Sequence, residues 1–151
     1  MKKVIFYSLL ALLSVGCSKG KYETKPQITV TSVTPDPVPL GSSVRITLEC
    51  TDKEGDVADS IYIIRERLNV KNPRTQAALI YKIPDFPSAP KIDIQVDLDY
   101  SKDLTIQIPA IRIPGSNPLR NEPDTMRLKF VAVDKAENRS DTAVTSFIVI
   151  R

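Results

Sequence analysis

The regular alternation of apolar and polar residues constrains this chain more than any other feature. Every second residue is apolar across 44–51, and the same pattern recurs across 91–98 and 126–132. Successive side chains of a β-strand point to opposite faces, so a repeat of two predicts strands that bury one face and expose the other. An amphipathic helix would need a repeat of roughly 3.6 residues, and no segment shows one.

Further apolar runs extend the all-β pattern along the chain. Strands are expected over 28–33, 60–67, 78–83, 104–113 and 142–150. Most of the twelve prolines fall between the runs or at their ends, where the missing N–H does not interrupt a ladder. The sequence therefore predicts an all-β fold, an immunoglobulin-like antiparallel β-sandwich of about 7–9 strands, with a closed barrel as the alternative.

Residues 1–16 have the features of an export signal. Lys2 and Lys3 form a basic start, and an apolar run over 4–15 follows. The run is about a dozen residues long, which is shorter than the roughly 20 residues that a bilayer span requires. We therefore expect a cleaved signal rather than a transmembrane helix.

The end of this signal, Leu-Ser-Val-Gly-Cys at 13–17, resembles a bacterial lipobox. The resemblance implies cleavage before Cys17, acylation of its thiol and amine, and retention of the protein at a membrane by its lipid. Ser14 departs from the pattern, since a leucine usually stands three places before the cysteine. The alternative is an ordinary secretory peptide that is cut nearby.

The expected organisation of the chain is a signal over 1–16, a flexible tether over 17–26 and a folded domain over 27–151. We expect an outer-membrane location facing the periplasm, with the cell surface as the alternative. Loss of Lys2 and Lys3 lowers the formal net charge from +3 to +1. A nearly neutral, exported chain is not expected to bind nucleic acid.

Several segments resemble a known group of domains. Residues 28–38, 41–48 and 51–57 look like the opening strands of bacterial immunoglobulin-like or cadherin-like domains, and 130–140 is similar to their penultimate strand and turn. Together with the lipobox, the chain resembles the small, mostly uncharacterised lipoproteins common in Bacteroidota. The resemblance implies a fold and a location, but no reaction.

Two acidic turns suggest a metal site. The candidate ligands are Asp52, Glu54, Asp56, Asp134 and Asn138. Both turns are expected at one end of the sandwich, and calcium takes six to eight oxygen ligands. The resemblance to cadherin-like domains, which bind calcium through acidic loops, implies the same site. The alternative is that these residues only cap exposed turns, beside the opposing charges of two neighbouring lysines.

A basic group around the expected hairpin at 60–83 suggests a second site. Its members are Arg65, Arg67, Lys71 and Arg74. Such a group would suit an anionic envelope polymer or a glycan, with Tyr62 and Tyr81 offering aromatic faces. The alternative is that these charges prevent strand addition at a sheet edge.

Catalysis is not expected. The chain has no histidine, which excludes Ser-His and Cys-His arrangements, and its five glycines form no phosphate-binding loop. Asp97 and Asp99 could act as paired carboxylates, but they continue the polar side of a strand. Cys50 lies on an apolar side and is expected to be a buried small hydrophobe.

These observations predict a non-catalytic binding or spacer module, lipid-anchored in the cell envelope as part of a protein assembly. The alternative function is a glycan-binding or calcium-stabilised adhesion module. No cofactor is expected apart from calcium, and the expected partners are the membrane and an envelope protein or glycan.

Overall fold

A computed structural model describes residues 23–56, 59–105, 108–146 and 148–150. The predicted signal, Cys17 and most of the predicted tether lie outside the described residues. None of the helical segments in this part of the chain has the length and apolar character that a bilayer span requires.

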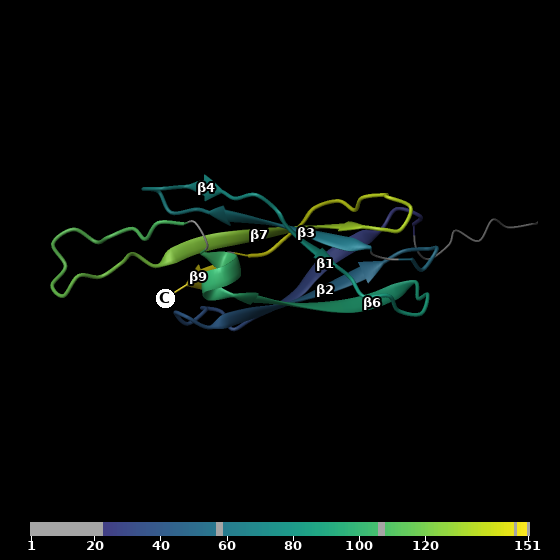
Figure 1. Ribbon diagram of the computed structural model, residues 1–151, viewed down its shortest axis with the longest axis horizontal. Coiled ribbons are helices and arrows are strands. Elements are labelled where there is room, and N and C mark those ends of the chain that lie inside the picture. The colour runs from purple at the N-terminus through teal and green to yellow at the C-terminus, as the bar shows by residue number, and fades with distance from the viewer. Residues whose placement is uncertain (1–22, 57–58, 106–107, 147, 151) are drawn as a thin grey trace, which may run out of the picture.

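The described residues form an antiparallel β-sandwich of two sheets, which confirms the predicted fold class (Figure 1). The smaller sheet has the order β1-β2-β6 and comprises β1 (Gln27–Thr34), β2 (Ser43–Thr51) and β6 (Lys91–Asp99). In the larger sheet, β3 and β7 are central, and each pairs with two short strands. Its members are β3 (Ser60–Arg67), β4 (Arg74–Thr75), β5 (Leu79–Lys82), β7 (Asp124–Val133), β8 (Ala143–Val144) and β9 (Ile148–Ile150).

The core lies between the sheets and is built from alternate residues of the long strands. Its central side chains, all fully buried, include Val44, Ile46 and Leu48 of β2 and Leu128 and Phe130 of β7. Apolar side chains from β3 and β6 complete the core. The alternation seen in the sequence thus separates the buried face of each strand from its exposed face.

Cys50 continues the buried side of β2, as predicted. Its side chain is fully buried and is not part of a disulfide. Burial raises the pKa of the thiol to about 12, with a smaller contribution from the carboxylates of Asp93 and Glu49. The thiol is therefore protonated at neutral pH and serves as packing.

The predicted strand over 104–113 is wrong for the described residues of that range. The chain forms a single π-helical turn, η1 (Tyr100–Leu104), and then an irregular loop. Asp99 caps the turn because its carboxylate accepts the backbone N–H groups of Ser101 and Lys102. Pro109 lacks the N–H that a ladder would need, which accounts for the loop.

Two other differences concern short strands. The predicted strand over 142–150 is divided into β8 and β9, and β4 was not predicted. The loop that contains residues 108–123 extends from one end of the sandwich, and the first described residues lie toward the other end (Figure 1). At that second end, the backbone N–H of Lys53 donates to the carbonyl of Glu23 at 2.9 Å. The turn after β2 therefore contacts the segment through which the chain enters the domain.

Candidate metal site

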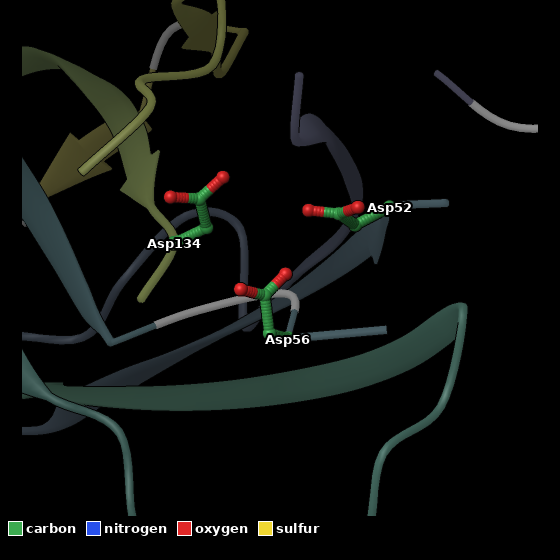
Figure 2. A group of neighbouring side chains, drawn as sticks. All are labelled: Asp52, Asp56 and Asp134. Carbon is green, nitrogen blue, oxygen red and sulfur yellow. The ribbon is translucent and has the colours of Figure 1, made fainter. Parts of the chain in front are cut away.

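Three aspartates converge at the end of the sandwich where the chain enters. Asp52 follows β2, Asp56 lies in the next turn, and Asp134 follows β7. One carboxylate oxygen from each lies within 4.8 Å of the others, and Figure 2 shows the three carboxylates facing a common space. Two oxygens that both lie about 2.4 Å from one calcium ion are at most about 4.8 Å apart. The spacing therefore suits a single shared cation.

Asp52 is the buried member that most needs a positive partner. Its side chain is 0% exposed. Oδ1 accepts the backbone N–H of Glu54 at 2.8 Å, whereas Oδ2 is buried and has no hydrogen-bond donor. Burial, reinforced by the neighbouring carboxylates, raises the pKa of this carboxyl group to about 6. A buried carboxylate oxygen without a donor is unfavourable unless a proton or a cation neutralises it.

Asp134 is held in place by its own turn. Its Oδ1 accepts the backbone N–H of Asn138 at 2.8 Å, and its Oδ2 accepts the side-chain amide of Asn138 at 2.9 Å. Glu137 adopts a positive φ of 67°, which closes the turn tightly. Asn138 therefore fixes the orientation of a buried carboxylate. The spacing of the predicted ligands along the sequence does not reveal this role.

The turn that carries Asp56 requires a glycine at position 55. Gly55 has φ of +76°, and a Cβ atom there would lie 2.5 Å from Oγ of Ser88 and 3.2 Å from N of Ala89. The N–H of Ala89 donates to the carbonyl of Gly55 at 3.1 Å. The loop that precedes β6 thus packs against the turn and helps to hold Asp56 beside Asp52.

Three of the five predicted metal ligands come together, and two do not. Glu54 is exposed, and its described contribution is the backbone N–H that bonds Asp52. Asn138 is also exposed and bonds Asp134. The positive charge next to Asp134 is engaged elsewhere, because Nζ of Lys135 donates to Asp85 at 3.1 Å. Its ammonium group therefore pairs with a carboxylate outside the group of three.

The predicted basic group does not form one surface. Arg65 and Arg67 are 4% and 1% exposed, whereas Lys71 and Arg74 are exposed. Arg65 donates to the carbonyls of Asp103 and Ala77. The sequence did carry a signal for this outcome, because both arginines are in phase with the buried Ile61 and Ile63 of the same strand.

The remaining carboxylate pair has structural partners. Asp97 accepts two hydrogen bonds from Arg45, at 2.7 and 2.9 Å, and this contact lowers its pKa. Asp99 caps η1, and the backbone N–H groups that it accepts lower its pKa in turn. Both carboxylates are thus accounted for by bonds within the domain.

No family model matches this chain, and no curated protein matches it. Among solved structures, it is similar to a β-glucosidase from Listeria innocua in complex with gluconolactone, with a TM-score of 0.51 and 13% identity. The match covers 83% of this chain but 16% of that chain. The same enzyme in complex with isofagomine gives a TM-score of 0.48 and 13% identity, over 83% of this chain and 16% of that chain. At this identity the likeness shows only that this chain shares the fold of one segment of a much longer protein.

Proposed function

We propose that this chain is a calcium-stabilised, non-catalytic binding or spacer module of the cell envelope, anchored by lipid on Cys17. One observation carries the calcium site: the buried Oδ2 of Asp52 lacks a donor and belongs to a group of three converging carboxylates. A cation in the shared space would neutralise that oxygen and remove the repulsion among the three carboxylates.

The chemistry of the ligands favours calcium. The three aspartates supply only hard oxygen donors, and the chain has no histidine to bind a softer metal. Calcium tolerates irregular coordination and takes its remaining ligands from backbone carbonyls and water. Magnesium is smaller and demands near-ideal octahedral geometry, so the group of three suits it less well.

The position of the site supports a spacing role. The backbone N–H of Lys53, next to Asp52, bonds the carbonyl of Glu23 in the segment through which the chain enters the domain. A cation that fixes the turn after β2 would also fix the direction in which the domain leaves its tether. We place the protein at the outer membrane facing the periplasm, as part of an assembly with another envelope protein. The tether and the lipid would set its distance from the bilayer.

A glycan-binding function has less support. The guanidinium of Arg139 lies 5.2 Å from the centroid of the Tyr62 ring and covers one of its faces. The hydroxyl of Tyr81 donates to Asp103 at 3.1 Å. Both tyrosines and the buried Arg65 and Arg67 are thus engaged within the domain, whereas Lys71 and Arg74 are exposed.

Calcium is expected to raise the melting temperature of the mature chain. A ligand that binds only the folded state adds about 1.4 kcal/mol when its free concentration is ten times Kd, which corresponds to several degrees. Thermal unfolding followed by circular dichroism, in calcium-depleted buffer and in millimolar CaCl₂, measures the shift. MgCl₂ at the same concentration is expected to give a smaller one.

Two variants with the same Asp→Asn change test whether the rise in melting temperature comes from the three aspartates. Asp52→Asn removes a ligand charge and is expected to abolish the response to calcium. Asp36→Asn makes the same change at an exposed position outside the site and is expected to keep it. An unchanged melting temperature of the wild type in millimolar calcium would contradict the calcium site.

Acylation of Cys17 is expected in the protein isolated from envelopes. Intact-mass and peptide mass spectrometry should show a chain that begins at Cys17 and carries diacylglycerol on its thiol, because two or three acyl chains are needed for stable anchoring. Cys17→Ser is expected to leave the protein unprocessed or to release it from the membrane fraction. An exported chain with an unmodified Cys17 would overturn the lipid anchor.

A further inference from the structure

We propose that the free edge of β6 binds an extended segment of another exported protein by strand addition. This inference specifies the binding role proposed above, and it does not depend on calcium. It rests on three features of β6, which are its open edge, the apolar groove beside it and the charge of its exposed face.

The edge of β6 is open and regular. β6 pairs with β2 alone among the described residues, and nine residue pairs run from Lys91 to Asp99 without a register shift. In Figure 1 it runs along one margin of the molecule. A long, unbulged edge strand presents main-chain donors and acceptors in the arrangement that another strand requires.

The other sheet edges in the described part of the chain lack this regularity. β1 has a register shift between Val30 and Ser32. In the larger sheet, the outermost strands are only two to four residues long, which limits strand addition. β6 has neither a bulge nor a short length to protect its edge. Its protection is the charge of its exposed face, which a segment of opposite charge would offset.

An apolar groove accompanies the open edge. Val96 and Leu98 of β6 are buried, but Ile92 and Ile94 on the same face are only half-buried. A groove with a volume of about 490 Å³ runs along this half of the strand, lined mainly by Ile83, Pro84, Phe86, Ile92 and Ile94. An added strand with apolar residues at alternate positions would cover these side chains and remove them from water.

The negative charge on the exposed face of β6 favours basic residues at the positions of the added strand that alternate with its apolar residues. Asp97 is paired with Arg45, whereas Asp93 forms no ion pair among the described residues and lies opposite Glu49 in the register. Nζ of Lys91 already pairs with Glu49 at 2.6 Å. A lysine or arginine on the added strand would therefore offset the charge of Asp93. The partner segment therefore alternates apolar and basic residues.

A second copy of this chain fits the edge less well. Antiparallel pairing of two β6 strands about Gln95 would place Asp93 of each copy opposite Asp97 of the other, and Lys91 of each copy opposite Asp99 of the other. Like charges directly opposite each other are destabilising and opposite charges are stabilising, so these pairs offset one another. A basic segment, which would face three aspartates and one lysine of β6, is therefore favoured over a second copy.

Hydrogen exchange with a model peptide tests the proposal. The probe is an eight-residue peptide that alternates valine and lysine, added to the mature chain. We expect exchange of amides in β6 to slow by at least about tenfold at saturating peptide, while amides of β1 are unaffected. A peptide of the same composition with its valines contiguous, and one with N-methyl groups on alternate residues, are expected to give no protection.

Variants and alternative outcomes make the test decisive. Asp93→Lys is expected to weaken binding about fivefold, whereas Asp36→Lys, the same change away from β6, leaves it unchanged. Absence of protection in β6, equal protection by the control peptides, or protection at β1 would each overturn the proposal. So would concentration-dependent protection of β6 without peptide, which would identify a second copy as the occupant. Because calcium can be varied independently, failure here is distinguishable from failure of the metal site.

Discussion

Arg67→Ala is expected to lower the free energy of unfolding by about 3–5 kcal/mol. The side chain of Arg67 is completely buried and forms an ion pair with Asp124, which is itself 13% exposed. It also donates to the carbonyl of Pro109 at 2.7 Å. Removing the guanidinium would leave a nearly buried carboxylate and a carbonyl without their donor.

The consequence extends beyond one pair. Through these contacts Arg67 connects the end of β3 with the start of β7 and with the loop at 108–123. Asn69 strengthens the same junction, because its side-chain amide donates to Glu122 and to the carbonyl of Pro123, each at 2.9 Å. We therefore expect Arg67→Ala to loosen the end of the sandwich opposite the acidic turns.

Denaturant unfolding of Arg67→Ala measures this prediction, and Arg45→Ala is its control. Arg45 also pairs with an aspartate, but both side chains are more than half exposed. Its removal is expected to change stability little, because exposed ion pairs contribute little. The double variant Arg67→Met with Asp124→Leu removes both charges and is expected to recover part of the loss. A loss below about 1 kcal/mol for Arg67→Ala would contradict the role assigned to the pair.

The sequence predicted the fold best where a strand buries one face only. In β2, β6 and β7 apolar and polar residues alternate along the strand, so the pattern predicts the strand, the side chains that face inward and their place in the core. Over 104–113 the apolar residues Leu104, Ile108 and Ile111 also reach the interior or pack against it, but through a turn and an irregular loop. Apolar composition indicates burial there without fixing the backbone conformation.

The candidate site was predicted in part, for a physical reason. Since β2 and β7 end at the same end of the sandwich, the sequence placed Asp52 and Asp134 together. It could not decide between Glu54 and Asp56, because the choice depends on the path of the turn and on the packing of Gly55 against Ala89. The burial of Arg65 follows from its phase in β3, whereas its positive charge taken alone predicts a surface position.

In calcium-depleted buffer, stability is expected to fall as pH rises from about 4.5 to 7. The pKa of Asp52 in the folded protein is about 6, above the ordinary value of 3.8. The folded state therefore binds a proton more tightly than the unfolded state, so raising the pH through this range removes a stabilising proton. A shift of this size corresponds to roughly 2–3 kcal/mol. The unfolding free energy from urea titrations at several pH values measures the effect.

Saturating calcium is expected to abolish this fall in stability. Calcium binds the ionised carboxylate, so its stabilisation should grow as pH rises through 6 and level off above 7. Asp52→Asn should flatten both profiles, because it removes the group that titrates and the charge that binds. Asp97 and Asp99 have lowered pKa values, so their contributions are lost only at pH values below this range. A rise in the stability of the calcium-depleted wild type between about pH 4.5 and 7 would mean that the pKa of Asp52 is not raised. Its carboxylate would then already have a hydrogen-bond donor or a cationic side chain of the protein as its partner, and the case for a cation at the three aspartates would fail.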